Sequence, residues 1–207
     1  MKTNNLRILL VVDSLDVGGA ERHVIDLATA LAVRGHEVEI ACSVLAGDGL
    51  GLSAGSIPVH ALLNNGVRRR LSLSYARELR RLLAEKPPDL VHAHVFASAA
   101  ASAAALATSP IPLVVTEHSE PRWQEAPARR IRRGYLRRAG HVIAASERIA
   151  WGCRNEAGLC AEGLSIIPCA VSPPPSPSHP NRYPAQGGRD RWSASWLGWC
   201  RRKEGIS

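Results

Sequence analysis

Short runs of consecutive apolar residues alternate along this chain with longer segments whose apolar residues recur every three or four positions. The first run covers 6–12, and after a loop at 14–19 apolar residues follow at helical spacing over 20–31. A continuous apolar run of this length is typical of a strand buried on both faces, whereas a period near 3.6 indicates a helix that covers a sheet. A second run at 38–43 completes a strand–helix–strand unit, which favours parallel pairing of the two strands.

The same alternation continues as far as residue 167. Further strands are predicted at 57–62, 90–93, 113–116, 141–145 and 164–167. Further helices are predicted at 73–83, 96–107, 129–139 and 147–156. Six or seven strands that alternate with helices predict an α/β fold with a doubly wound, Rossmann-like parallel sheet. We expect this domain to cover residues 1–171.

The composition changes after residue 171. Proline and serine dominate 172–180, and residues 189–207 hold three of the five tryptophans without a helical or strand period. Residues 172–207 are therefore predicted to be a proline-rich linker and a tail that forms no second domain. One interpretation is a disordered tail, and the other is an aberrant segment in which a longer gene ends early or is read out of frame. We favour the second, because tryptophan-rich sequence is atypical of disorder.

The net charge of +8 comes from 23 arginines and only 3 lysines. Nucleic-acid binding is not expected, because the sequence has neither a zinc-finger spacing nor a basic zipper. Six arginines crowd the helix predicted at 129–139: Arg129, Arg130, Arg132, Arg133, Arg137 and Arg138. One interpretation is peripheral contact with an anionic membrane. The other, which we favour, is an amphipathic helix whose arginines are solvated.

The cysteines and the N-terminal segment indicate in which cellular compartment the protein resides. Five cysteines occur without a C-x-x-C pair, so neither a zinc site nor a disulfide framework is expected. The first apolar run ends at Asp13, too early for a signal peptide or a membrane span. We expect a cytoplasmic protein, located peripherally at the inner membrane face if the arginines bind lipid. A metal site at His92 and His94 is not expected, because a third ligand at suitable spacing is missing.

The loop between the first strand and its helix carries the strongest chemical signal. It contains the adjacent Gly18 and Gly19, and in a doubly wound sheet it lies at the carboxyl edge, where ligands bind. Such glycines let backbone N–H groups approach a ligand, and a helix N-terminus favours an anion. The alternative is a tight turn without a ligand. The spacing is not G-x-G-x-x-G, and the second strand ends in Cys42-Ser43 rather than an acidic residue, which argues against a nicotinamide-dependent oxidoreductase.

An ordered set of motifs between residues 6 and 171 resembles glycosyltransferase family four. The set comprises GGAERH at 18–23, RGHEV at 34–38, IPVH at 57–60, PDLVHAH at 88–94, VVTEH at 114–118, RRAGHVIAASE at 137–147 and IIP at 166–168. The resemblance implies the N-terminal, acceptor-side half of a GT-B fold, in which two Rossmann-like domains face each other. It also implies retaining transfer from a nucleotide-sugar to a glycan or lipid-linked acceptor, without a metal or another cofactor.

The resemblance also implies roles for four residues of this chain. Gly18 and Gly19 would face the donor phosphates. His118 would lie over the transferred sugar as the catalytic residue, and His94 would line the acceptor side of the cleft. For each histidine an ordinary structural role, such as a surface or capping side chain, is the alternative.

Two features depart from the family pattern. Residues 168–172 read Pro-Cys-Ala-Val-Ser where the family often has Pro-Asn-Gly-Val-Asp. Residues 172–207 also supply no second domain, with its basic residues for the pyrophosphate and its paired glutamates for nucleotide and sugar. We therefore expect a truncated glycosyltransferase half that is inactive alone. The alternative is a non-catalytic binding or partner module that keeps the fold.

Overall fold

The structure is a computed structural model of the 207-residue chain. It describes residues 5–16, 18–45, 54–64, 72–119 and 126–169. All of these belong to one compact unit, Met1–Val171. The tail predicted at 172–207 lies outside the described residues, and the domain boundary after residue 171 stays a prediction.

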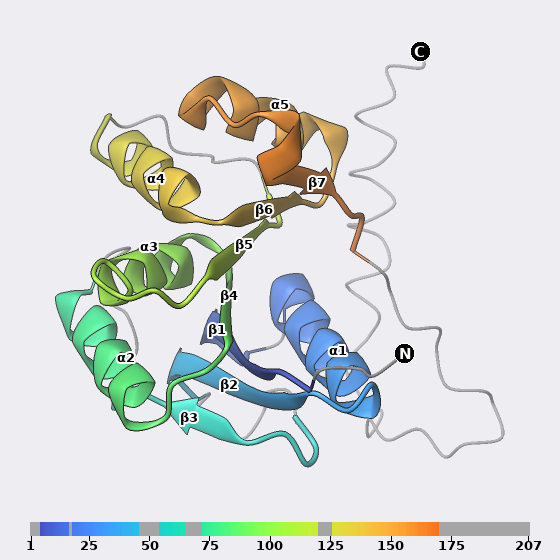
Figure 1. Ribbon diagram of the computed structural model, residues 1–207, viewed down its shortest axis with the longest axis vertical. Helices are drawn as coiled ribbons and strands as arrows, with labels where there is room; N and C mark the ends of the chain where they lie inside the picture. Colours follow the sequence, from blue (N-terminus) through green and yellow to red (C-terminus); the bar gives the residue numbers. More distant parts are fainter. Residues whose placement is uncertain (1–4, 17, 46–53, 65–71, 120–125, 170–207) are drawn as a thin grey trace, which may run out of the picture. The chain divides into compact units, whose positions relative to one another are not determined.

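Seven parallel strands form one sheet in the described part of the chain. They are β1 Arg7–Ser14, β2 Glu37–Val44, β3 Val59–Ala61, β4 Leu90–His94, β5 Leu113–Glu117, β6 His141–Ala144 and β7 Leu164–Ile166. Their order is β3-β2-β1-β4-β5-β6-β7, and all neighbours pair in parallel (Figure 1). The chain therefore builds outward from β1 to one edge and then returns to the other side of β1. This order confirms the doubly wound, Rossmann-like sheet, and its switch point lies between β1 and β4.

The helices lie close to their predicted positions. They are α1 Gly19–Val33, α2 Leu73–Glu85, α3 Phe96–Ala105, α4 Ala126–Arg138 and α5 Glu147–Ala157, with a short 3-10 turn at Ala161–Gly163. Strand β3 begins two residues later than predicted, directly after Pro58, which has no N–H to donate to the ladder. Helix α1 ends before Gly35, whose φ of +91° is the left-handed conformation expected of a glycine after a helix.

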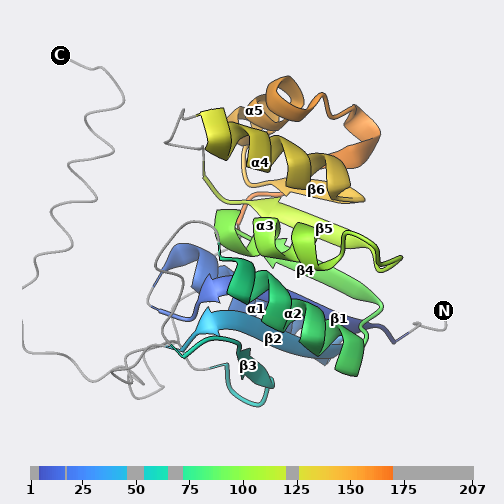
Figure 2. The same ribbon diagram turned by 90° about the vertical axis from the view of Figure 1, so that its left-hand side faces the viewer.

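The two faces of the sheet carry different helices. Because side chains alternate along a strand, Leu9 and Val11 pack into the core cluster with α2, α3, α4 and α5. Ile8, Leu10 and Val12 pack into a second cluster with α1. Figure 2 shows α2, α3 and α4 in front of the sheet, with α1 on its far side. The face that carries α1 is the one on which the candidate site is built.

Helix α4 corrects the interpretation of Arg132. Its side chain is 2% exposed, and its guanidinium donates to Glu156 of α5 over 2.5 Å and contacts Glu117 of β5 at 3.3 Å. The Tyr135 hydroxyl donates to the same Glu117 carboxylate over 2.7 Å. Arg132 is therefore neither solvated nor available to a membrane. It is buried because the carboxylate of Glu117, itself buried at the end of β5, needs a positive partner.

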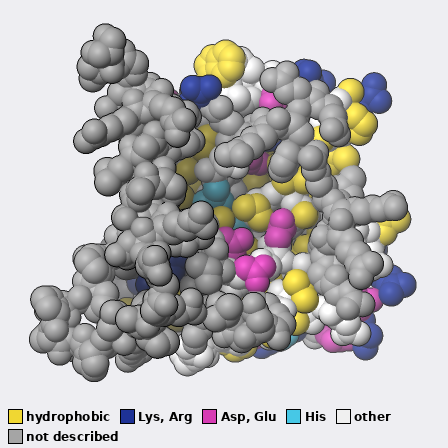
Figure 3. Space-filling model, turned by 180° about the vertical axis from the view of Figure 1, so that it is seen from behind, with side chains coloured by type: hydrophobic (Ala, Val, Ile, Leu, Met, Phe, Trp, Pro, Cys, Tyr) yellow, Lys and Arg dark blue, Asp and Glu magenta, His cyan; other side chains and the backbone are white. Residues whose placement is uncertain are grey.

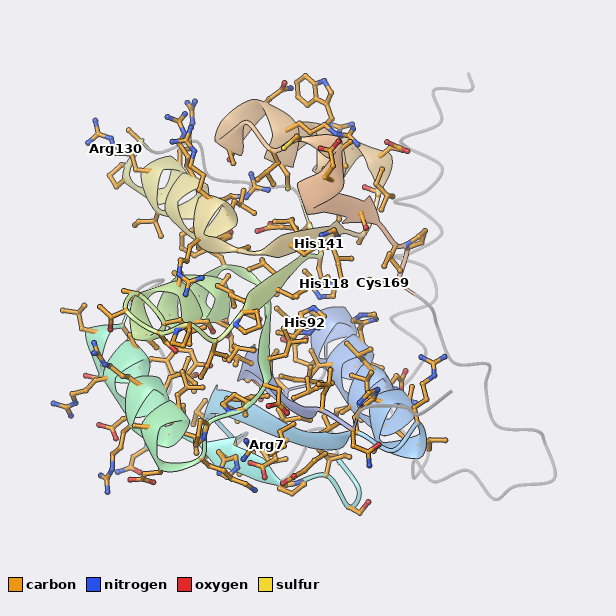
Figure 4. All side chains as sticks on the ribbon, viewed as in Figure 1. Arg7, His92, His118, Arg130, His141 and Cys169 are labelled. Carbon is orange, nitrogen blue, oxygen red and sulfur yellow. The ribbon has the colours of Figure 1, made fainter. Side chains whose placement is uncertain are left out.

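The other arginines of α4 lie at the surface or at its margin. Three of them, Arg133, Arg137 and Arg138, donate to backbone carbonyl oxygens of neighbouring segments: those of Glu156, Ala157, Leu106 and Ser109. Arg129 and Arg130 are exposed, and Arg130 points away from the sheet in Figure 4. Membrane contact stays a prediction for these surface arginines. Within the described residues, no helix is both long enough and apolar enough to cross a membrane.

Candidate functional site

Three histidines meet at the carboxyl edge of the sheet. His94 ends β4, His118 directly follows β5, and His23 lies in the second turn of α1. His94 Nδ1 is 3.1 Å from His118 Nε2, and the ring of His23 lies 5.2 Å from that of His118 and 5.8 Å from that of His94. The meeting follows from the register, because β4 and β5 pair in parallel with His94 opposite Thr116.

Strand alternation adds a fourth histidine to this group. His92 and His94 are two residues apart on β4, so both point to the α1 side, while Val91 and Ala93 face the larger core. The rings of His92 and His94 are 4.2 Å apart, and His92 Nε2 lies 2.7 Å from Thr116 Oγ1. We call His23, His92, His94 and His118 the histidine cluster.

The cluster is held in its neutral form. Burial, with a smaller contribution from the nearby His23, lowers the pKa of His118 to about 4. Burial, with smaller contributions from His23 and His118, lowers the pKa of His92 to about 3. Burial also lowers the pKa of His94 well below its usual range and that of His23, the latter against the charge of Asp26. At neutral pH each imidazole therefore has one N–H donor and one unprotonated acceptor nitrogen. The described residues contain no group of three or more His, Cys, Asp or Glu arranged to hold a metal ion.

Cys169, three residues after β7, completes the surroundings of His118. Its Sγ is 3.4 Å from His118 Nδ1, and Figure 4 shows the two side chains next to each other. Burial raises the pKa of this thiol, which therefore stays protonated at neutral pH. Both ring nitrogens of His118 thus have a protein partner. At the other end of this chain of contacts, His94 Nε2 is buried without a hydrogen-bond partner among the described residues.

The two glycines lie at the start of α1. Gly18 is the N-cap residue, with an extended backbone, and it provides no side chain to cap the helix. A Cβ at Gly18 would collide with the flexible carboxylate of Glu21, whereas a Cβ at Gly19 would meet nothing within 4 Å in the described structure. His23 lies four residues after Gly19 and so on the same face of α1. The N-terminus of α1 is therefore next to the histidine cluster.

At the N-terminus of α3, a carboxylate of the protein itself accepts the hydrogen bonds that an anionic ligand could otherwise accept. Asp13 of β1 accepts hydrogen bonds from Ser98 N over 2.8 Å and from Ser98 Oγ over 2.5 Å. Burial raises the pKa of Asp13, and the bonds from Ser98 oppose that change. Val95, between His94 and α3, has a φ of +62°, a strained conformation for a β-branched residue. The hydrogen bonds from Ser98 to Asp13 and the strained backbone of Val95 therefore fix the conformation of the connection between β4 and α3.

The structure brings His94 and His118 together and places Gly18 and Gly19 one turn before His23. The sequence motif contained His23, but its role was not predicted. Its spacing of four from Gly19 on a helix was the available signal. Cys169 was noted only as a departure from the family pattern. Its contact with His118 joins segments 51 residues apart, so it needed the fold.

The comparison with known families decides the membership of the chain. The model of glycosyltransferase family 4 matches residues 17–173. The chain belongs to glycosyltransferase family 4. This confirms the resemblance, and the match includes the whole histidine cluster, Cys169 and both glycines of this family 4 domain. A comparison with curated proteins found no match.

Solved glycosyltransferase structures have the same fold as this family 4 domain. HepE of Anabaena, in complex with UDP-glucose, superposes with a TM-score of 0.62 over 81% of this chain and 44% of its own, at 23% identity. The lipopolysaccharide outer core galactosyltransferase WaaB superposes with a TM-score of 0.60 over 84% of this chain and 50% of its own, at 19% identity. A glycosyltransferase from Rickettsia africae ESF-5 superposes with a TM-score of 0.61 over 80% of this chain and 43% of its own, at 18% identity. The chain therefore spans half or less of the length of these proteins.

Proposed function

We propose that this domain is the acceptor-side half of a retaining glycosyltransferase that uses a nucleotide-sugar donor and a glycan or lipid-linked acceptor. The observation that carries the proposal is the neutral His118 at the carboxyl end of β5, beside His23 and the glycine start of α1. Family membership supports the reaction class, and the UDP-glucose complex of HepE supports the class of donor.

We assign His118 to the transferred sugar. Retaining transfer passes through a transition state with positive charge on the sugar ring. A protonated imidazole there would add a second positive charge, whereas a neutral one can hydrogen-bond a sugar hydroxyl without that penalty. The pKa of His118, lowered to about 4, favours the neutral form at all physiological pH values. His118 would thus act by hydrogen bonding rather than as a proton donor.

We assign Gly18 and Gly19 to the donor phosphates. A helix N-terminus presents backbone N–H groups and a partial positive charge to an anion. The described fold does not require a glycine at position 19, since a Cβ there would meet no described atom within 4 Å. Close approach of a ligand to the backbone is therefore a sufficient reason for glycine. The Glu21 side chain, which covers Gly18, would have to turn away when phosphate binds.

His94 is proposed to act on the acceptor side through His118. Its side chain is fully buried, so it would hold the neighbouring imidazole by the contact from Nδ1 to Nε2 rather than touch the acceptor itself.

We propose that residues 1–207 alone do not complete transfer. Negative charge grows on the departing phosphate, and positive groups aimed at it lower such barriers by several kcal/mol. In Figure 3 apolar and acidic side chains lie next to the histidine surface that is visible between the grey residues. The cationic groups would come from a second domain, whose closure would also exclude water.

A donor panel tests this proposal. Residues 1–207 are incubated with UDP-, GDP- and ADP-sugars, nucleotide release is measured, and a two-domain glycosyltransferase serves as the positive control. We expect no release above background and weak nucleotide binding. Turnover by residues 1–207 that is abolished by His118→Ala would show that one domain suffices. Complete absence of nucleotide binding, also in a fusion with a family 4 second domain, would favour the non-catalytic binding module.

We also propose a cytoplasmic location for this domain. The four described cysteines are free thiols, which is usual in a reducing compartment. The hydrogen bonds that Arg133, Arg137 and Arg138 make within the protein favour a structural role for α4 over peripheral membrane contact.

A further inference from the structure

The imidazole of His118 has two protein partners of very different accessibility. Nε2 contacts His94, which is fully buried behind it. Nδ1 contacts the thiol of Cys169, an exposed residue three positions after β7. A ligand that approaches from solvent can therefore reach Nδ1 only where the thiol now lies, and it cannot reach Nε2 without displacing the buried His94.

The direction of these hydrogen bonds follows from the protonation states. The thiol keeps its proton because partial desolvation of its sulfur raises the pKa of Cys169, and the imidazole stays neutral because burial lowers the pKa of His118. Sulfur is a weak acceptor and imidazole nitrogen a strong one, so the thiol donates to Nδ1. His118 then carries its proton on Nε2 and donates it to His94 Nδ1. His94 Nε2 is buried and has no partner in the described structure, so this series of hydrogen bonds ends there.

We infer that Cys169 is a positioning residue that occupies Nδ1 of His118 until a ligand hydroxyl replaces the thiol there. The inference rests on the proposed function in one respect, namely that the incoming hydroxyl is that of a sugar. A hydroxyl is a stronger donor than a thiol, so the exchange replaces a weak hydrogen bond with a better one. In the absence of ligand the thiol fixes both the orientation of the ring and the nitrogen that carries its proton.

Acylation by diethyl pyrocarbonate, which attacks unprotonated imidazole nitrogen, measures this occupation directly. The full chain is treated at neutral pH, and the rate at His118 is followed by peptide mass spectrometry. We expect Cys169→Ala to raise this rate about two- to tenfold, the range for loss of one ordinary hydrogen bond. Cys169→Ser, which keeps a donor, should not raise this rate. Cys160→Ala, at another exposed cysteine, is the matched control and should change nothing.

The outcomes separate the inference from the proposed function. Equal acylation of His118 in the Cys169→Ala and unaltered chains, both folded by circular dichroism, would overturn the inference. A second arm measures UDP-glucose binding to the same variants by titration, and Cys169→Ala should bind several-fold more tightly than Cys169→Ser. Faster acylation without any effect on sugar-nucleotide binding would support the thiol contact and count against the proposed ligand.

Discussion

At the scale of single residues, the histidine cluster makes the chain sensitive to acid. Each of its members has a pKa below the value of about 6.5 that histidine has in an unfolded chain. Between that value and the folded pKa, the unfolded chain binds protons that the folded chain does not. Their uptake therefore favours unfolding, and stability is fully present above pH 6.5 and is lost as the pH falls.

We predict that the free energy of unfolding drops steeply between pH 6.5 and 4. His118 alone, with a folded pKa of about 4, accounts for roughly 3 kcal/mol over this interval. Urea unfolding followed by circular dichroism at half-unit steps of pH gives the slope. His118→Gln, which removes one of the titrating groups, should make the dependence shallower. A stability that does not change between pH 6.5 and 4.5 would contradict neutral burial of the cluster.

At the scale of elements, α4 is fastened to the sheet by a buried ion pair as well as by apolar packing. Arg132 lies between Glu117 of β5 and Glu156 of α5, so it connects three elements. Removing one member of such a pair leaves an uncompensated buried charge, which costs about 3–5 kcal/mol. The neighbouring Arg133 is exposed and donates to one backbone carbonyl.

We predict that Arg132→Met lowers the free energy of unfolding by about 3–5 kcal/mol, whereas Arg133→Met changes it by less than about 1 kcal/mol. The two variants alter the same residue type on adjacent positions of one helix, so helix propensity and net charge change equally. Urea denaturation of both variants is the measurement. Equal destabilisation by the two variants would mean that the buried carboxylate of Glu117 does not need the positive charge of Arg132 as a partner.

Helix α4 also shows which features of the structure could be predicted from the sequence and which could not. The helix predicted at 129–139 is confirmed, because helical periodicity is a local property. Its apolar residues Ile131, Tyr135 and Leu136 pack in or against the larger core. The burial of Arg132 could not be predicted in this way, since it depends on a carboxylate that β5 contributes. His118 was found through its motif at a strand end, while the contact of Cys169 with it requires the pairing of β5, β6 and β7.

At the scale of the whole molecule, the described core ends at β7, and the segment after it reaches the histidine cluster. Leu164 packs in the larger core cluster, and Cys169 contacts His118. We therefore predict that residues 1–171 expressed alone unfold at the same urea concentration as residues 1–207. The midpoints of the two chains, measured side by side, check this. A clear loss of stability in the shorter chain would disprove the predicted domain boundary after residue 171.

The strand order also has a consequence for the order of events during synthesis. β1 leaves the ribosome before the other described strands but lies between β2 and β4 in the finished sheet, and its pairing with β4 joins residues about 80 positions apart. β1, α1 and β2 can associate early, whereas Leu9 and Val11 stay without their core until α2 and α3 have been made. Closing such long loops slows folding and exposes apolar surface meanwhile. We expect the nascent chain to depend on chaperones until β5 has emerged, which is also when His118 can first meet His94.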